Sequence, residues 1–392
     1  MAIKDYTARQ APEYTPVRSG TTRAAPVRIK VIGVGDGGCN CVKRMMHHAV
    51  PGMTFAMVNT DDKTLDTEVS QADVILINKH EVRGWDAFGE YRAGDGGFEE
   101  SSAQLRKVLA GSDLVFVTAG MGGGAGTGAA TYVAHLAREI GALVVGLVPF
   151  PFRFERRRRM GLAVSGVDRL RPHVDNLILV HNDRLLTYIN LEAPMLRAFH
   201  AADDAVPQRI LSVSELINVP HEINIDLAGI RSIMGNRGGS LMAIGRGNRD
   251  AGPLEAARQT VANPLSDLRL GQAQCVLILV TGGVPGMTLA GVNSACQLVA
   301  DAVPKHAGIT VGMGVDESMG EKVNLTLIAT GIQDESIKPD QGADQTQNPS
   351  AHAGSGPPAG RQPPAFSRTG TALTAQPPTR DAALITVSTS RT

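Results

Sequence analysis

The glycine-rich segment at residues 122–128 is the part of the sequence that most clearly indicates chemistry. It reads Gly-Gly-Gly-Ala-Gly-Thr-Gly, directly after the apolar run Leu114–Thr118, and a helical pattern follows over Ala129–Glu139. Glycine lets backbone N–H groups approach a phosphate, and a helix N-terminus adds partial positive charge. A flexible surface turn seldom needs more than two glycines, so the segment predicts an anion site.

A second glycine loop follows the first apolar run of the chain. Gly33, Gly35 and Gly38 match the pattern G-x-G-x-x-G, and Asp61 follows at about the distance at which dinucleotide-binding folds place their ribose acid. An NAD-dependent oxidoreductase therefore stays open as an alternative. Two glycine loops at one sheet edge fit a mononucleotide triphosphate better, and the sequence lacks the G-x-x-x-x-G-K-[ST] pattern of P-loop enzymes.

Composition narrows the classes of partner and compartment. The chain has 392 residues, enough for two domains plus tails, and its 38 Lys+Arg balance its 38 Asp+Glu. No basic patch is interleaved with aromatic residues, so we expect no nucleic-acid partner. The four cysteines form no C-x-x-C pair, which fits a reduced cytoplasm and argues against a zinc site. No signal peptide and no apolar run of about 18 residues is present, so direct membrane insertion is not expected.

Short apolar runs alternate with helical patterns, which predicts an α/β fold with a parallel sheet. The expected strands are Ile29–Val34, Thr54–Asn59, Val74–Ile77, Leu114–Thr118, Leu143–Val148 and Asn176–Val180. The expected helices between them include Asn40–His48, Glu99–Ala110 and Glu155–Leu170. Ligands of such sheets bind at the carboxyl ends of the strands, which is where both glycine loops fall.

The order of elements changes after a longer helix expected at Asp203–Asn218. The further expected elements are Leu241–Gly245, Leu254–Ala262, Val276–Thr281, Leu289–Ala302 and the paired strands Thr310–Val315 and Lys322–Thr330. This pattern predicts a second, smaller α/β domain with a mixed sheet.

Several motifs carry a resemblance to a known family. Residues 122–128 resemble the tubulin signature G-G-G-T-G-T-G. The segments similar to FtsZ, the bacterial tubulin homologue, are 29–35, 58–61, 151–155, 181–185 and 224–226. The resemblance is collinear over residues 28–332. It implies a tubulin/FtsZ-like Rossmann-type GTPase domain, a long connecting helix and a second, smaller α/β domain with a mixed sheet.

Composition and resemblance together divide the chain into five regions. They are a flexible N-terminal arm (1–27), a GTP-binding domain (28–198), a connecting helix (199–219), a C-terminal α/β domain that carries the catalytic (synergy) loop (220–332) and a disordered tail (333–392). The tail is rich in Gln, Pro, Ala, Gly, Ser and Thr, and it has too little apolar surface to offset the entropy of ordering.

The resemblance implies GTP or GDP as the ligand, together with Mg²⁺, although no residue is assigned as a metal ligand. The first loop would bind the phosphates, Asn59–Asp61 would lie beside the phosphates or their metal, and Gly123 and Gly124 would cradle the α- and β-phosphates.

The same resemblance places Glu155 and Arg159 at the ribose and phosphates, and Asn182, Asp203 and Asp204 at the guanine edge. A carboxylate suits guanine because its N1–H and N2 amine are paired donors. An N-cap role is the alternative for Asn182. The full set implied for the nucleotide is Gly35, Asp36, Gly37, Gly38, Cys39, Asn40, Asn59, Thr60, Asp61, Gly122, Gly123, Gly124, Ala125, Gly126, Thr127, Gly128, Glu155, Arg159, Asn182, Asp203 and Asp204.

In FtsZ-like proteins a loop with the pattern N-x-D-x-x-D enters the pocket of the next subunit and polarises the attacking water. Here Asn224 and Asp226 match as catalytic residues, but Gly229 holds the final carboxylate position. Loss of a positioned acid or base typically costs about 100- to 10,000-fold in rate, so we expect slow GTP hydrolysis. The head-to-tail contact does not close, and it therefore predicts filaments of this chain with itself.

Other departures from the family also fall near the phosphates. Ala125 replaces a threonine, Asp36 and Cys39 replace glycines, and Asp86 and Glu90 stand in a rebuilt loop. Carboxylates repel phosphate unless a metal or an arginine intervenes, so these side chains either bind a metal or point to solvent.

The tail holds a partial match to the family's adaptor-binding peptide I-P-A-F-L-R, formed by Pro364, Ala365, Phe366 and Arg368. A chance match in Pro/Ala-rich sequence is the alternative. The resemblance thus implies a GTP-binding, self-polymerising protein of bacterial cell division, cytoplasmic and at mid-cell. The alternative is a hydrolysis-poor paralogue that co-assembles with an orthodox FtsZ.

Overall fold

The computed structural model describes residues 25–48, 50–60, 71–77, 99–155, 157–185, 195–219, 223, 225–236, 238–249, 251–262 and 269–332. All of them belong to one compact unit, 1–341. Several sequence predictions lie outside the described residues: most of the arm at 1–27, Asp61, the loop with Asp86 and Glu90, Asn224, and the tail with residues 364–368.

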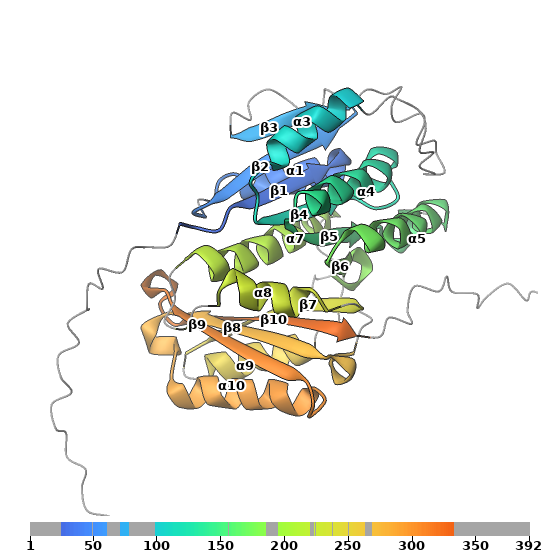
Figure 1. Cartoon of the computed structure of the whole chain (residues 1–392). Helices are drawn as coiled ribbons and strands as arrows, with labels where there is room; N and C mark the ends of the chain where they lie inside the picture. The colour runs from blue at the N-terminus through green and yellow to red at the C-terminus, as the bar shows by residue number, and fades with distance from the viewer. Residues whose placement is uncertain are drawn as a thin grey trace, which may run out of the picture. The chain divides into compact units, whose positions relative to one another are not determined.

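Six parallel strands form the N-terminal part of the sheet, in the order β3-β2-β1-β4-β5-β6 (Figure 1). They are β1 (Ile29–Val34), β2 (Met53–Asn59), β3 (Ala72–Leu76), β4 (Leu114–Ala119), β5 (Leu143–Phe150) and β6 (Asn176–His181). Every residue of β1 and β4 is buried, as expected for parallel strands that are covered on both faces. The strand order reverses between β1 and β4, the place where ligands of such sheets bind.

Helices cover both faces of this sheet. They are α1 (Gly35–Met45) and α7 (Met195–Asn218) on one face, and α3 (Glu99–Leu109), α4 (Gly124–Glu139) and α5 (Arg157–Leu170) on the other. Because side chains alternate along a strand, Ile29 and Val31 of β1 pack in the core under α1 and α7, whereas Ile32 and Val34 pack under α3, α4 and α5.

Helices α1 and α4 begin earlier than the sequence predicts. The predicted starts were Asn40 and Ala129, but the helices begin at Gly35 and Gly124, inside the two glycine loops. Glycine is a poor helix former, by about 1 kcal/mol relative to alanine. The residue types of these first turns therefore do not predict a helix. Consequently the free N–H groups of both helix starts lie within the glycine loops themselves.

The C-terminal part confirms the predicted mixed sheet. Its elements are α8 (Leu227–Met234), β7 (Gly239–Asn248), α9 (Gly252–Val261), β8 (Cys275–Gly282), α10 (Leu289–Ala302), β9 (Gly308–Val315) and β10 (Lys322–Ile332). Strand β10 is antiparallel to β7 and β8, and β9 is parallel to β8. A single pair, Ile178 with Ser240, joins β6 to β7, so the strands make one ten-stranded sheet.

The predicted pairing of 310–315 with 322–330 is wrong. Strand β10 lies between β7 and β8, while β9 pairs, among the described residues, with β8 and with the single residue Ile223. Burial explains this order, because β10 is buried along nearly its whole length, whereas β9 is mostly exposed or only partly buried. A buried strand needs neighbours on both sides, and an exposed strand suits an edge.

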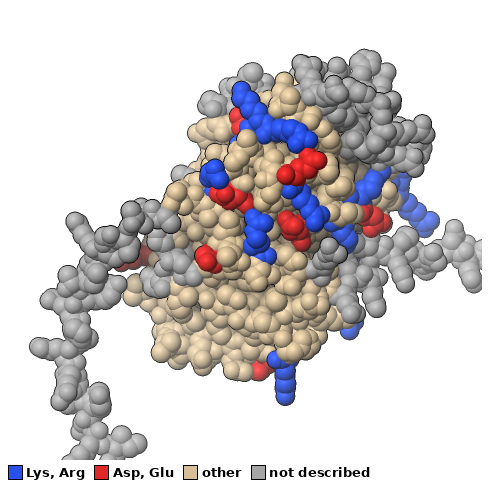
Figure 2. Space-filling view, in the orientation of Figure 1, with Lys and Arg blue, Asp and Glu red and all other residues tan. Residues whose placement is uncertain are grey.

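Helix α7 connects the two parts through a shared core (Figure 1). Val213 and Leu216 belong to the same apolar cluster as Val31 of β1 and Leu279 of β8. Figure 2 shows charged side chains of both signs mixed over the N-terminal part, and few over the visible face of the C-terminal part. In the described part of the chain, no helix is both long and apolar enough to cross a membrane.

Candidate functional site

The two glycine loops pack against each other at the carboxyl ends of β1 and β4. Gly35 has φ +67°, and a Cβ on it would lie 2.8 Å from the backbone N of Gly126. A Cβ on Gly37 would lie 3.2 Å from Cα of Gly120, whereas one on Gly124 would meet nothing within 4 Å. Most of these glycines are therefore required by loop-to-loop packing, and Gly124 leaves open space at the start of α4.

Neither helix start is capped by a side chain. Val34 precedes α1 and Gly123 precedes α4, and neither N-cap residue offers a side-chain acceptor to the first turn. The first N–H groups of an uncapped helix need another partner, and an anion such as phosphate supplies one. Thr127 has a different task, because its buried hydroxyl accepts from the N–H of Gly122 at 2.9 Å and so holds the second loop in shape.

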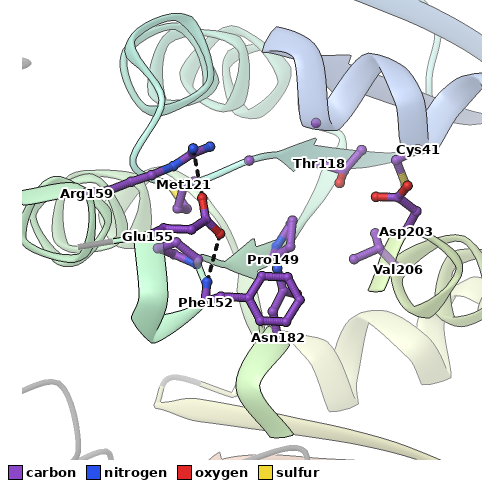
Figure 3. Close-up of a pocket in the computed structure, with 13 residues that line it drawn as sticks. Cys41, Thr118, Met121, Pro149, Phe152, Glu155, Arg159, Asn182, Asp203 and Val206 are labelled. Carbon is purple, nitrogen blue, oxygen red and sulfur yellow. Dashed lines mark hydrogen bonds and ion pairs between the residues drawn. The ribbon is translucent and has the colours of Figure 1, made fainter. Parts of the chain in front are cut away.

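A cavity of about 290 Å³, called the main cavity below, opens beside the start of α1 (Figure 3). Its wall is formed by the carboxyl ends of β4 and β5, by the segments that follow β4, β5 and β6, and by residues of α1, α5 and α7. Its lining residues are Gly37, Cys41, Thr118, Gly120, Met121, Pro149, Pro151, Phe152, Glu155, Arg159, Asn182, Asp203 and Val206. The main cavity thus brings together predicted residues from the first loop, the ribose position and the base position.

Glu155 and Arg159 form the rim of the main cavity. Glu155 accepts from the N–H of Phe152 at 2.9 Å, and its other oxygen lies 2.8 Å from Nη1 of Arg159 (Figure 3). The Arg159 side chain is half exposed. The carboxylate therefore holds a cation at the mouth of the cavity, where it can meet a negatively charged ligand.

Asn182 and Asp203 also line the main cavity. The Oδ1 atom of Asn182 is buried and has no hydrogen-bond partner among the residues that the structure describes. Such an atom is available to accept from a donor group of a bound ligand. Asp203 adds a carboxylate next to Cys41 and Val206 (Figure 3), so the two residues offer acceptors to a ligand with N–H groups, as guanine has.

Arg44 of α1 pairs with both predicted carboxylates of α7. Its guanidinium lies 2.6 Å from Oδ1 of Asp204 and 3.3 Å from Oδ2 of Asp203. Both aspartates line a second, more open depression with Lys43 and His47, and Asp203 also lines the main cavity. The structure therefore brings Asp203 to the main cavity and does not bring Asp204 there.

The remaining predicted residues of the first loop lie around its edge. Asp36 is exposed and accepts from Nδ2 of the buried Asn59 at 2.8 Å, while Oδ1 of Asn59 accepts from the N–H of Thr60 at 2.7 Å. Burial raises the pKa of Cys39 to about 12, so this residue is a neutral part of the core. Asn40 lines the second depression.

Several cavity residues were missed by the sequence prediction. Gly120 and Thr118 directly precede the glycine segment, and Phe152 belongs to the motif at 151–155, so their positions in the sequence contained a signal. Cys41 and Val206 carried none, because both are ordinary apolar helix residues. Burial raises the pKa of the Cys41 thiol to about 12, which keeps it neutral in the cavity wall.

Asp226 lies outside the main cavity and caps a helix. Its Oδ1 accepts from the N–H of Gly229 at 2.8 Å, which makes it the N-cap of α8. The residue is exposed, and it is not among those that line the main cavity. Any chemistry of this carboxylate on a ligand in the main cavity would therefore have to act on another copy of the chain.

The described residues contain no group of three or more His, Cys, Asp or Glu that is placed to hold a metal ion. Mg²⁺ on a nucleotide is held mainly by phosphates and water with one or two carboxylates, so the donor set here still fits a nucleotide-bound Mg²⁺.

Comparison with known proteins decides the family. Residues 28–190 match the GTPase domain of the Tubulin/FtsZ family, and residues 238–333 match the C-terminal domain of the FtsZ family. A point mutant of FtsZ from M. jannaschii is 31% identical over 78% of this chain and 92% of that chain, with a TM-score of 0.69. This chain belongs to the FtsZ family.

Two further structures agree with this assignment. An empty FtsZ dimer from M. jannaschii is also 31% identical, over 78% of this chain and 88% of that chain, with a TM-score of 0.69. CetZ2 from Haloferax volcanii, in a protofilament bound to GTPγS, shares the fold at 19% identity over 78% and 94% of the two chains, with a TM-score of 0.64. This FtsZ-family protein therefore has the fold of polymerising GTPases that bind GTP and GDP, which leaves the NAD-dependent alternative without support.

Proposed function

We propose that this FtsZ-family protein binds GTP in the main cavity, assembles head to tail, and hydrolyses GTP slowly as a cytoskeletal protein of bacterial cell division at mid-cell. One observation carries the proposal. The start of α1, the Glu155–Arg159 pair, and Asn182 with Asp203 line one cavity of about 290 Å³, together with Gly120 and Met121, which precede the second glycine loop.

Each end of the cavity suits a different part of GTP. The backbone N–H groups at the starts of α1 and α4 are donors for phosphate oxygens, and Arg159 adds a cation at the rim. The Oδ1 of Asn182, which has no hydrogen-bond partner in the described part of the chain, and the carboxylate of Asp203 are acceptors for N1–H and N2 of guanine. A Mg²⁺ ion beside Asn59–Asp61 would neutralise the phosphates and polarise the transferred phosphoryl group.

Assembly would bring the loop before α8 of one subunit to the cavity of the next. The antiparallel bridge of Ile223 with Met313 puts this loop at the carboxyl end of β9, next to the end of β8. Val284 and Leu289 follow β8 and are 60% and 84% exposed. On the cavity side, Phe154 is 63% exposed. Exposed apolar side chains at both ends favour a heterologous contact between copies, which makes filaments.

Hydrolysis would be slow because the supplied loop is incomplete. Gly229 has no side chain to orient water, and Oδ1 of Asp226 already accepts a helix N–H. Asp226 and Asn224 would keep part of the activity. The loss of one positioned acid or base would lower the rate of hydrolysis about 100- to 10,000-fold.

Sedimentation with and without GTP, paired with phosphate release from the same sample, tests the proposal. We expect the full chain to pellet only with GTP, and turnover per subunit to begin above a threshold concentration and to stay low. Pelleting that ignores nucleotide, or turnover that is independent of protein concentration, would contradict assembly-dependent hydrolysis.

A second candidate is a paralogue that co-assembles with an orthodox FtsZ. It is favoured by the contrast between a fully formed main cavity and the loop with Gly229. GTP in the cavity of such a subunit could be hydrolysed with the loop of an orthodox neighbour, whereas its own loop would promote hydrolysis in the next subunit poorly. Mixing the two proteins should then lower turnover per orthodox subunit while the filaments persist.

Residues 364–368 remain a proposed contact for division adaptors, to be tested by peptide binding.

A further inference from the structure

Asp36 stands at the seam between the two glycine loops. The glycines on either side of it are fixed against the second loop, since a Cβ on Gly35 would meet Gly126 at 2.8 Å and one on Gly37 would meet Gly120 at 3.2 Å. The backbone of Asp36 is therefore held where the starts of α1 and α4 meet.

The orientation of its carboxylate is also determined. Asn59 is only 2% exposed, and its Oδ1 accepts from the N–H of Thr60 at 2.7 Å. This fixes the Asn59 amide so that Nδ2 faces the first loop and donates to Oδ1 of Asp36 at 2.8 Å. A carboxylate oriented by a buried amide cannot swing freely away from the seam.

Asp36 puts a negative charge at the start of α1, next in sequence to Gly37, which lines the main cavity. It is the acidic residue in the first turn of α1, and the first turn of α4 has none. A helix N-terminus attracts one anion, so this carboxylate and a nucleotide phosphate compete for the same partial positive charge. Arg159, the cation at the rim, is already paired with Glu155 at 2.8 Å.

We propose that Asp36 makes the binding of a nucleoside triphosphate depend on a divalent cation. Without the cation, the carboxylate repels the triphosphate more than the diphosphate, because the third phosphate adds charge near the loop. With Mg²⁺, the carboxylate becomes a ligand that helps to hold the ion against the phosphates. The inference rests on the proposed function, since it assumes a guanine nucleotide in the main cavity.

Equilibrium binding of fluorescent GDP and of a fluorescent non-hydrolysable GTP analogue to the full chain tests this, with Mg²⁺ or with EDTA. In the wild type, Mg²⁺ should raise the affinity for the triphosphate at least about tenfold more than the affinity for the diphosphate, an estimate for partly screened charges. In Asp36→Asn and Asp36→Gly the difference should fall below about threefold, with a gain in triphosphate affinity in EDTA.

Asp301→Asn is the matched control. Asp301 is an exposed aspartate that also accepts from a side-chain amide at 2.8 Å, that of Gln297, but it lies on α10 away from the loops. It should behave as the wild type does. Circular dichroism checks that each variant is folded, and Asp36→Asn keeps the side-chain volume if Asp36→Gly does not fold.

The outcomes separate the two claims. If the wild type binds neither nucleotide with Mg²⁺, the proposed function fails. If it binds both but Asp36→Asn keeps the wild-type response to Mg²⁺, or binds the triphosphate more weakly in EDTA, then only the role of Asp36 is wrong.

Discussion

Restoring a carboxylate at Gly229 tests the explanation for slow hydrolysis most directly. The missing acid or base is worth about 100- to 10,000-fold, which at 1.36 kcal/mol per tenfold is about 2.7–5.4 kcal/mol of barrier. Gly229 is the third residue of α8, after the N-cap Asp226. An acid in the first turn of a helix stabilises it by about 0.3–1 kcal/mol, so Gly229→Asp should fold.

The local geometry limits how much activity returns. A Cβ at position 229 would lie 3.1 Å from Oδ1 of Asp226 and 3.1 Å from Cγ2 of Ile225. Both are side-chain atoms that can move by a few tenths of an ångström, but the new carboxylate starts beside an existing one. We therefore expect Gly229→Asp to recover about 10- to 100-fold in turnover, less than the full loss.

The assay follows phosphate release above the assembly threshold, together with the pelleted fraction. Gly229→Asn is the control, because it has the same shape without the charge, and it should stay at the wild-type rate. If Gly229→Asp pellets normally but turns over no faster than Gly229→Asn, hydrolysis is not limited by a missing carboxylate and the reasoning is wrong.

Three further predictions follow from the site and from α7. Gly126→Ala should lower the free energy of unfolding by more than about 2 kcal/mol in denaturant titration, because its Cβ would lie 2.7 Å from O of Gly120. Gly124→Ala should not lower the free energy of unfolding to this extent, because its Cβ would meet nothing within 4 Å. Asn182→Ala should weaken guanine-nucleotide binding about tenfold in titration calorimetry, with the melting temperature of the free protein unchanged, because its Oδ1 has no partner there among the described residues. Burial raises the pKa of Glu215, so the folded state holds this proton more tightly than the unfolded state does. The free energy of unfolding should therefore fall as pH rises above the ordinary carboxyl range. Chemical unfolding across that range should show this loss in the wild type and a smaller loss in Glu215→Gln.

Local patterns predicted the elements well where burial is continuous. The bounds of β1 and of α10 match the prediction at both ends. The apolar run that predicts a strand covered on both faces ends where β1 ends, and the amphipathic pattern that predicts a helix ends where α10 ends. Patterns failed where tertiary contacts override local preference. Helix α4 begins at Gly124 rather than at Ala129, since the glycines that local propensity excludes are held by loop-to-loop packing.

Pairing over long sequence separations could not be predicted in the same way. The position of β10 between β7 and β8 depends on which strands need two neighbours, and this is a property of the whole sheet. Likewise, nothing in the motif at 203–204 indicates that Arg44, 160 residues away from Asp204, pairs with both carboxylates, or that Asp203 lines the main cavity and Asp204 does not. The resemblance proposed the residues of the site, and the structure shows which of them line the main cavity.

The proposed catalytic unit has two halves that tolerate substitution differently. The receiving half is the pair of glycine loops that would bind the nucleotide, and the supplying half is the loop before α8 of the neighbouring subunit. The receiving half is built from backbone donors, and a Cβ on Gly35 or Gly126 would meet backbone atoms at 2.8 and 2.7 Å, so substitution there damages the fold as well as the ligand site. The supplying half is an exposed helix start, where Gly229 stands at the position of the expected carboxylate and Asp226 caps α8. Under the proposed function, a chain can therefore lose a hydrolytic group there at little cost in stability, whereas a substitution in the glycine loops would destabilise the fold.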